Sequence, residues 1–425
     1  MLHLTIMLLT RKKRTTSFTI MPSYKTALVL ASVLLCITTT SGKNYVSPLN
    51  VVETFPIKHD ARASLNSCPC KNKFLCMPLS QAKNKYPTAP HVLNFIKKSN
   101  KTEVFAFVVK CDASVWGKFD WSKLTTVALA NFYDAELICH AHQHGVRVVK
   151  LGNFPTTKLG NITARRNWIN IQISDVTLKF LDGINIDYED ALDPFTPEQY
   201  GLTSLVKETA EVFHTAIPGS QVSFDVAWSA RGIDGRYYEY KKIADYSDVI
   251  FIMAYDEQSQ ILKGPCAARP NSGFYKTVQG TMTYLDLGIP PTKMILGVPW
   301  YGYTYPCLQL DKNNTCYIKE VPFRGVNCSD AAGKELPFRE ILNIRHLYNA
   351  TDHWDQNSLT PWFNFKSKEG QHQIWYDDER SLLYKYMVAI VTGFRGVGMW
   401  TANFLDYSDT PEAKLQQEHM WGLLP

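Results

Sequence analysis

Residues 182–189, with the sequence DGINIDYE, combine acidic and amide side chains at a spacing that suits chemistry. Asn185, Asp187 and Glu189 alternate with apolar or aromatic neighbours, which is the pattern of a β-strand. Side chains on one face of a strand recur every second residue, about 6.6 Å apart, so these three share a face. Because buried carboxylates are costly unless they are paired or hydrogen-bonded, the row indicates a functional site.

The two carboxylates of this row suit acid–base catalysis. Nearby carboxylates repel each other, which raises the pKa of one and keeps it protonated for use as an acid. Glu189 is expected at the open end of the strand, with Asp187 one layer below, whereas Asp182 is out of phase and needs its own partner. The alternatives are a Ca²⁺ or Mg²⁺ site, with an EF-hand excluded by the alternating isoleucines, and a solvated surface strand.

The elements that must position this row are short apolar segments that alternate with helical patterns. Near-continuous apolar runs are typical of strands covered on both faces, as in a parallel sheet with helices outside. Eight such strands are expected, at residues 103–110, 124–131, 146–153, 183–188, 221–228, 248–255, 294–300 and 396–401. Eight βα units predict an α/β fold, a (β/α)₈ TIM barrel. A doubly wound sheet is the alternative, but the chain has no dinucleotide-binding glycine fingerprint.

The interval between the seventh and eighth strands is longer than most others and contains Pro, Trp and Tyr clusters. We interpret residues 304–375 as a small subdomain inserted on the loop face, which carries the chemistry in barrel enzymes. The predicted organisation is a targeting segment at 1–42, a cysteine-containing lead-in at 43–100 and a catalytic barrel at 101–425.

The first 42 residues have the layout of a secretory signal: basic residues, an apolar run at 27–37, then small and polar residues. The apolar run is too short to span a bilayer. A mitochondrial presequence is the alternative, and Met21 is a second candidate start. Without this segment the net charge falls from +6 to +1, which favours neither nucleic acid nor a membrane surface as a partner.

Glycosylation motifs and cysteines also fit the secretory route. The Asn-X-Ser/Thr acceptors are Asn100, Asn161, Asn313, Asn327 and Asn349. Nine cysteines remain after the signal, and in an oxidising compartment the groups 68/70/76 and 307/316/328 indicate disulfides. The odd number leaves at least one free thiol, with Cys111 and Cys139 as candidates, and the sequence leaves the pairing open.

The run DGINIDYE resembles the DxxDxDxE signature of glycoside hydrolase family 18, the chitinase-like (β/α)₈ enzymes. Three further family motifs follow in order at the ends of expected strands. They are Met253–Asp256 at the end of the sixth strand, Gly297–Gly302 at the end of the seventh and Gly398–Trp400 at the end of the eighth. The resemblance extends from about Cys68 to the C-terminus.

The resemblance implies roles for individual residues. Glu189 would protonate the glycosidic oxygen and later act as base, while the substrate's own 2-acetamido carbonyl attacks as nucleophile, with net retention. Asp187 would orient the acetamide and Tyr255 would donate its hydroxyl to it. The expected substrate-binding residues are Asp182, Asn185, Met253, Asp256, Trp300, Tyr301 and Trp400, the last as a stacking floor. No metal and no cofactor is expected.

The expected substrate is an oligosaccharide, the GlcNAc-β1,4-GlcNAc core of N-linked glycans, cut so that the reducing-end sugar is released. A secreted endo-chitinase is the nearest alternative, and a non-catalytic chitinase-like lectin is another. Family lectins typically lack the acid, which is present here as Glu189. The lysosome is the expected location, with an extracellular one as the alternative, and a monomer is the expected state.

One position departs from the family pattern, because Asn185 stands where the family usually has aspartate. An amide carries no charge and shares no proton with Asp187. The expectation is that Asp187 stays ionised more readily and that the pH profile shifts, without loss of activity.

Overall fold

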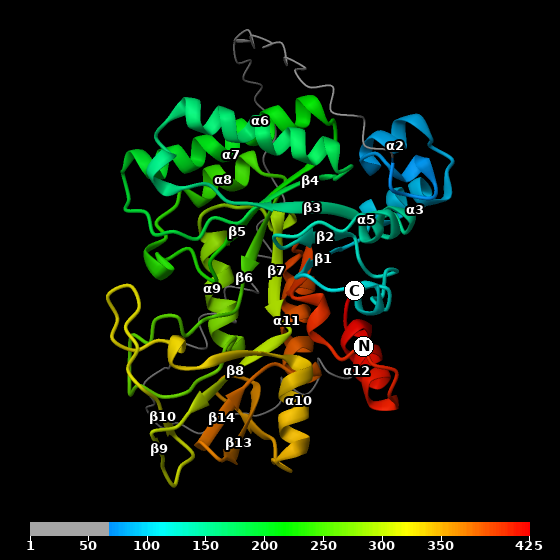
Figure 1. Cartoon of the computed structure of the whole chain (residues 1–425). Coiled ribbons are helices and arrows are strands. Elements are labelled where there is room, and N and C mark those ends of the chain that lie inside the picture. Colours follow the sequence, from blue (N-terminus) through cyan, green and yellow to red (C-terminus); the bar gives the residue numbers. More distant parts are fainter. Residues whose placement is uncertain (1–67) are drawn as a thin grey trace, which may run out of the picture. The chain divides into compact units, whose positions relative to one another are not determined.

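Residues 68–425 are described by the structure, a computed structural model. Eight parallel strands close into a barrel in which each strand pairs with the next and β15 pairs with β1 (Figure 1). They are β1 (Glu103–Val108), β2 (Thr126–Leu129), β3 (Arg147–Gly152), β4 (Gly183–Ile186), β5 (Gln221–Val226), β6 (Val249–Met253), β7 (Met294–Pro299) and β15 (Gly396–Trp400). The predicted (β/α)₈ barrel is confirmed. The predicted signal at 1–42 lies outside the described residues, as do residues 43–67 of the lead-in.

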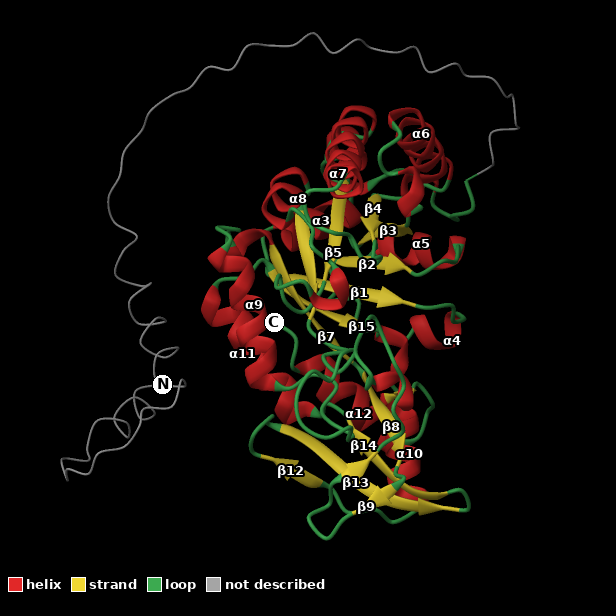
Figure 2. Ribbon diagram, turned by 90° about the vertical axis from the view of Figure 1, so that its left-hand side faces the viewer, coloured by secondary structure: helices red, strands yellow, loops and turns green. Residues whose placement is uncertain are grey.

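Helices connect the strands and cover the barrel, as Figure 2 shows for α7, α8, α9 and α11. The sequence marks their starts: Thr196 accepts a hydrogen bond from the amide of Gln199 ahead of α7, and Asp378 forms a capping box ahead of α11. The helices are α2 (Leu79–Lys85), α3 (Pro90–Ser99), α4 (Ala113–Trp116), α5 (Ala135–Gln143), α6 (Ile162–Leu178), α7 (Pro197–Ala216), α8 (Tyr240–Tyr246), α9 (Phe274–Asp286), α10 (Phe338–Leu347), α11 (Glu379–Thr392) and α12 (Pro411–Gly422). Short 3₁₀ turns occur at Lys73–Leu75, Thr156–Lys158, Ile233–Gly235, Pro291–Lys293, Asp330–Ala332 and Ala402–Phe404.

The inside of the barrel is filled by aromatic rings. Phe105 and Phe107 of β1 pack on Phe251 of β6, with ring centroids 5.4 and 4.9 Å from that of Phe251. Gly297 of β7 leaves the room for this packing, because a Cβ atom there would lie 2.1 Å from the Phe251 ring. This plug blocks the barrel axis, so polar groups gather above it, at the ends where the strands stop.

A second sheet lies beyond the end of β7 (Figure 1). It is antiparallel, in the order β11-β8-β14-β13-β12, and α10 packs on β8 and β11. Its strands are β8 (Tyr301–Pro306), β11 (Lys334–Pro337), β12 (His353–Asp355), β13 (Thr360–Ser367) and β14 (Gly370–Trp375), with a small hairpin of β9 (Gln309–Leu310) and β10 (Cys316–Tyr317). The sheet begins three residues before the segment 304–375 that the sequence indicates as an insertion. Tyr303 pairs with Glu335 of β11 and with Trp375 of β14, so β8 joins the barrel rim to the insertion.

Four disulfides fasten the described part of the chain: Cys68–Cys76, Cys70–Cys139, Cys266–Cys328 and Cys307–Cys316. Of the two thiols predicted as candidates for the free one, Cys139 is paired. Cys111 is the free cysteine among residues 68–425. The pairs 70–139 and 266–328 join segments that are distant in sequence, which is why spacing alone left them open.

Candidate active site

The row Asn185, Asp187 and Glu189 rises from the barrel interior to its mouth. Asn185 is fully buried within β4, and Asp187 lies just past the strand, its amide still donating to the carbonyl of Gly152 on β3 at 2.9 Å. Glu189 is farthest out, and 49% of its side chain is exposed. The acid that the sequence singles out is therefore the member of the row that a substrate can reach.

Glu189 is held by a cation that the sequence did not indicate. The guanidinium Nη2 of Arg236 lies 2.6 Å from Oε2 of Glu189 and 3.5 Å from Oδ2 of Asp234. The Arg236 side chain is only 10% exposed, so this ion pair is shielded on the protein side. Arg236 therefore fixes the position of the Glu189 carboxylate.

Asp187 is the carboxyl group of the row that retains a proton. Burial raises the pKa of Asp187 to about 7, the nearby charge of Glu189 and a hydrogen bond with it add to the rise, and Arg236 opposes it. The expectation that Asp187 ionises more readily with Asn185 than with an aspartate at that position stays a prediction. The absence of charge at Asn185 removes one source of repulsion, but burial and Glu189 outweigh it.

Asn185 forms hydrogen bonds with the neighbouring strand rather than with the mouth. The Ser223 hydroxyl donates to Oδ1 of Asn185 at 2.6 Å, and Nδ2 of Asn185 donates to Oδ2 of Asp225 at 2.6 Å. Both partners belong to β5 and are buried. Asn185 thus lies below the substrate level, and its two polar atoms are both occupied.

The motif after β6 brings Tyr255 and Asp256 to the same mouth. Tyr255 is buried, and burial, followed by the charges of Asp225 and Asp256, raises the pKa of its hydroxyl, which stays protonated as a donor. Asp256 accepts hydrogen bonds from the hydroxyls of Tyr301 at 2.6 Å and Tyr303 at 3.2 Å. Burial raises the pKa of Asp256 to about 6, although these two bonds oppose the rise.

Trp400 at the end of β15 lies above the aromatic plug, with its ring centroid 5.2 Å from that of Phe107. It is partly exposed, and Glu335 of the insertion is hydrogen-bonded to it. Met253 belongs to the same apolar cluster. A partly exposed indole above a closed barrel is a suitable floor for a sugar ring.

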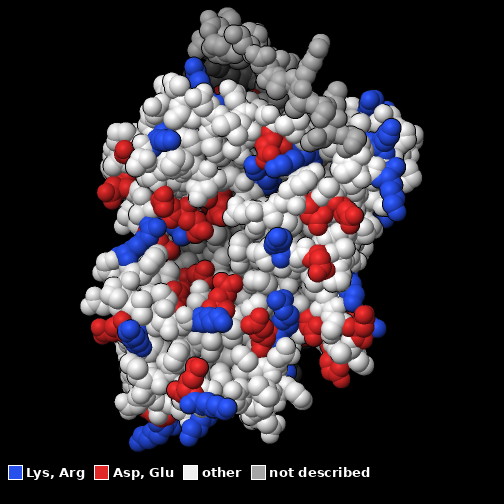
Figure 3. Space-filling view, viewed as in Figure 1, with Lys and Arg blue, Asp and Glu red and all other residues white. Residues whose placement is uncertain are grey.

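Acidic groups surround this mouth on more than one side. Burial, together with the charge of Asp256, raises the pKa of Asp330 and of Glu335, each to about 7. The space-filling view shows acidic side chains on opposite sides of a hollow in this face (Figure 3). Carboxyl groups around the mouth disfavour anionic ligands, which is consistent with an uncharged oligosaccharide.

Two predicted substrate-binding residues lie elsewhere. The indole of Trp300 is fully buried: it packs on Trp421 of α12 at 5.2 Å, and its Nε1 donates to the Tyr386 hydroxyl. Because side chains alternate along the chain, Tyr301 and Tyr303 point to Asp256 while Trp300 points away from it. Trp300 is a packing residue, so its prediction as a sugar contact is wrong.

Asp182 lies at the other end of β4, so its prediction as a substrate-binding residue is also wrong. Its carboxylate accepts hydrogen bonds from the amides of Leu79 at 2.6 Å and Val148 at 2.7 Å, and its Oδ2 lies 2.8 Å from Nε2 of His142. The other ring nitrogen of His142 contacts the carbonyl of Leu75. Asp182 therefore connects the lead-in to the base of the barrel. Leu79, Val148 and His142 are the separate partners expected for a residue out of phase with the acid row.

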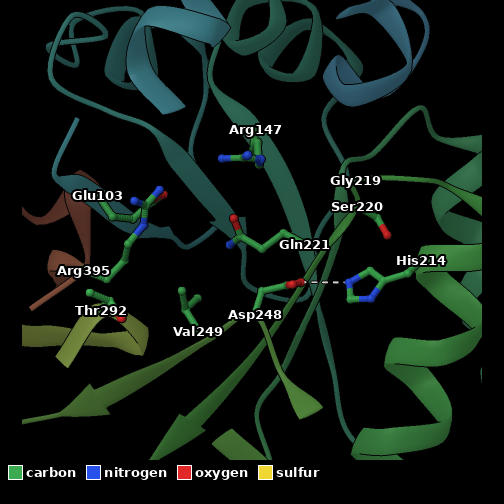
Figure 4. Close-up of a pocket in the computed structure, with 10 residues that line it drawn as sticks. All are labelled: Glu103, Arg147, His214, Gly219, Ser220, Gln221, Asp248, Val249, Thr292 and Arg395. Atoms are coloured by element: carbon green, nitrogen blue, oxygen red, sulfur yellow. Dashed lines mark hydrogen bonds and ion pairs between the residues drawn. The ribbon is translucent and has the colours of Figure 1, made fainter. Parts of the chain in front are cut away.

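A cavity of about 520 Å³ opens at that same base (Figure 4). Its lining includes Glu103, Arg147 and Gln221, the first residues of β1, β3 and β5. Charges of both signs face it, and Asp248 is paired with His214 there. Since barrel enzymes carry their chemistry at the opposite end, this cavity is not the candidate active site.

Comparison with known proteins identifies the family. Residues 104–404 match the sequence profile described as glycosyl hydrolases family 18. The chain belongs to this family. Among its family 18 relatives, di-N-acetylchitobiase of Rattus norvegicus is 44% identical over 364 residues, which cover 85% of this chain and 94% of the relative. Di-N-acetylchitobiase of Homo sapiens is 41% identical over 363 residues, covering 85% of this chain and 89% of the relative.

A solved structure supports the fold. A class V chitinase from Nicotiana tobaccum superposes with a TM-score of 0.59, covering 76% of this chain and 99% of that chain. At 16% identity this similarity concerns the barrel architecture alone. The confirmed resemblance thus rests on the sequence profile and on the more similar relatives.

The buried acids predict that this family 18 protein is most stable at acidic pH. Burial raises the pKa of Glu257 to about 7, as it does for Asp187, so the folded chain holds protons that the unfolded chain releases near pH 4. For His142, burial lowers the pKa but Asp182 outweighs it and raises it, which acts in the same direction. For each such carboxyl group the free energy of unfolding should therefore fall by about 1.4 kcal/mol per pH unit between about pH 4 and 7, and the contribution of His142 should be lost above pH 6.5.

Differential scanning calorimetry at pH 5 and pH 7.5 measures this effect. We expect the unfolding temperature to be several degrees higher at pH 5. An unchanged or higher unfolding temperature at pH 7.5 would show that these groups are ionised at little cost in the folded protein.

Proposed function

We propose that this glycosidase cleaves di-N-acetylchitobiose, the GlcNAc-β1,4-GlcNAc core of N-linked glycans, and releases the reducing-end GlcNAc. One observation carries the proposal: the reachable acid Glu189 lies next to the proton-retaining Asp187, with the Tyr255 hydroxyl at the same mouth. The relatives named di-N-acetylchitobiase, at 41–44% identity over most of both chains, support this substrate.

The proposed reaction is substrate-assisted and retaining. In the proposal, Glu189 starts as a carboxylate paired with Arg236, and Asp187 keeps the shared proton. On substrate binding this proton passes to Glu189, which donates it to the glycosidic oxygen as the acetamido carbonyl attacks the anomeric carbon. Asp187, now ionised, faces the positive oxazolinium ion, and the Tyr255 hydroxyl orients the acetamide before the attack. Water then attacks the anomeric carbon, whose bond to the acetamide oxygen breaks and restores the acetamide, while Glu189 takes a proton from the water.

A loop of the insertion lies beside the acid. Arg324 donates hydrogen bonds to the main-chain carbonyls of Asp234 at 2.7 Å and Glu189 at 3.3 Å. Its loop is tied to the loop after β6, because the amide of Ile261 donates to the carbonyl of Cys328 and Cys328 is bonded to Cys266. In the proposal this loop lies beside the acid on the leaving-group side and leaves room for one sugar there.

Product analysis tests the proposal. With chitotriose labelled at its reducing end, the expected first product is labelled GlcNAc, and proton NMR should show the newly formed reducing end as the β-anomer. Internal cleavage of longer chitin oligomers would favour the endo-chitinase instead. An initial α-anomer would overturn the retaining mechanism while leaving the substrate assignment intact.

The proposed location is the secretory route, ending in the lysosome. Four disulfides support an oxidising folding compartment, and the raised carboxyl pKa values favour an acidic destination. All five predicted glycosylation acceptors are exposed: Asn100, Asn161, Asn313, Asn327 and Asn349. Within residues 68–425, no helix combines the length and the apolar character needed to cross a membrane.

A further inference from the structure

We propose that Asp225 of β5 is a positioning residue for the reaction: it stays protonated and donates a hydrogen bond from Oδ1 to Asp187 when Asp187 becomes ionised. The inference rests on the proposed function. In this role Asp225 replaces the aspartate that the family usually has at the position of Asn185.

The strand register places the two carboxyl groups next to each other. β4 and β5 are parallel, with Asn185 opposite Ser223 and Ile186 opposite Phe224. Continued by one residue, this register sets Asp187 opposite Asp225, on adjacent strands about 4.8 Å apart. The register also gives both side chains the inward orientation of Asn185, and Asp225 is only 2% exposed.

The hydrogen bonds of Asn185 decide which oxygen of Asp225 carries the proton. Ser223 donates to Oδ1 of Asn185, so the amide nitrogen must face Asp225, where it donates to Oδ2 at 2.6 Å. Oδ2 is thus an acceptor, and the proton belongs on Oδ1. Oδ1 of Asp225 and Oδ1 of Asp187 are both buried and have no hydrogen-bond partner among the described residues.

The surrounding charges favour a neutral Asp225. Asp187 and Glu189 face it from the segment after β4, and Tyr255 faces it from the segment after β6. Burial and then the charge of Asp187 raise its pKa well above the ordinary value, whereas the bond from Asn185 opposes the rise. Arg236 is paired with Glu189. Its charge lowers the pKa of Asp187, and it forms no bond to Asp225.

This arrangement has a chemical consequence for the proposed reaction. When Asp187 passes its proton to Glu189, a new carboxylate forms in a site without water-like solvation. The O–H of Asp225 can then donate to that carboxylate, and its proton stays on Asp225 throughout, so no net transfer occurs. An aspartate at position 185 would compete for the same protons; the amide of Asn185 instead fixes Asp225 in its donating orientation.

Three substitutions test the assignment. Asp225→Asn keeps a donor of the same shape, and Asp225→Ala removes it; Asp248→Asn, at the base of the barrel, is the matched control. We expect Asp225→Ala to lower kcat on chitobiose about 10- to 100-fold with little change in KM, and to move the pH–rate profile. Asp225→Asn should retain a large part of kcat, and Asp248→Asn should leave the profile unmoved. Equal loss in Asp225→Asn and Asp225→Ala would overturn the proposal, as would wild-type kcat and profile in Asp225→Ala.

A measurement without substrate separates this inference from the proposed function. Infrared difference spectra between the wild type and Asp225→Asn, recorded at pH 6, should show the carbonyl band of a protonated carboxyl group that the variant lacks. A carboxylate band in its place would overturn the inference even if the enzyme cleaves chitobiose. A protein inactive on chitobiose that still shows the protonated band would refute the proposed function and leave the protonation state standing.

Discussion

Glu189→Gln is expected to lower kcat on di-N-acetylchitobiose by about 10²–10⁴-fold, the usual contribution of a positioned general acid. Glutamine has the shape of glutamate but cannot donate its proton to the glycosidic oxygen or take one from water. The substitution also ends the ion pair with Arg236, whose Nη2 lies 2.6 Å from Oε2. Steady-state kinetics at acidic pH, with circular dichroism to confirm folding, measure the effect.

Asp190→Asn is a matched control for this prediction, because Asp190 is the adjacent exposed acid and is hydrogen-bonded to Thr156. It should keep most of the wild-type kcat. Full activity in Glu189→Gln would remove Glu189 from the mechanism. If wild type and variant were equally inactive yet both bound chito-oligosaccharides, the lectin alternative would be the better description.

Lys385→Met is expected to lower the free energy of unfolding by about 3–5 kcal/mol, as does the loss of one partner from a buried ion pair. Lys385 and Asp377 are almost completely buried, with Nζ and Oδ1 2.5 Å apart. Nζ also donates to the carbonyl and hydroxyl oxygens of Ser272, and that hydroxyl donates to the carbonyl of Ala254, next to Tyr255. Without Lys385 the carboxyl of Asp377 stays buried without its cation. Chemical denaturation at pH 7 measures the change.

Two further variants make this prediction specific. Arg380→Ala removes a partly exposed ion pair with Asp378, the N-cap of the same helix, and should cost less than about 1 kcal/mol. The double variant Lys385→Met with Asp377→Leu removes both charges and should recover much of the lost stability. A double variant as unstable as the single one would show that the bonds to Ser272, rather than the charge, carry the effect.

The barrel and the acid row were predictable because their signals are local. The eight strands are buried on both faces, so each is an apolar run, and strand periodicity alone places Asn185, Asp187 and Glu189 on one face. Trp300 and Asp182 were wrongly predicted to bind substrate, although the same periodicity indicates that they do not. Trp300 is out of phase with Tyr301 and Tyr303, and Asp182 is out of phase with the acid row.

Other features depend on contacts between distant segments, which a single sequence does not reveal. Arg236 reaches Glu189 across 47 residues, and Cys70 reaches Cys139 across 69. The pKa of Asp187 likewise depends on contacts that the sequence does not reveal. The missing charge at Asn185 was visible in the sequence, but the burial that outweighs it, and the neighbouring Asp225, became visible only in the folded chain.

The disulfide between Cys266 and Cys328 gives the insertion tolerance to proteolytic nicking. It closes a covalent ring that contains β7, β8 and the hairpin of β9 and β10. The exposed tip of that hairpin, near Asn313, lies inside a second, smaller ring closed by Cys307 and Cys316. Exposed loop tips are preferred sites of proteolysis. If a peptide bond at this tip is cut, both new ends stay attached through two independent disulfides.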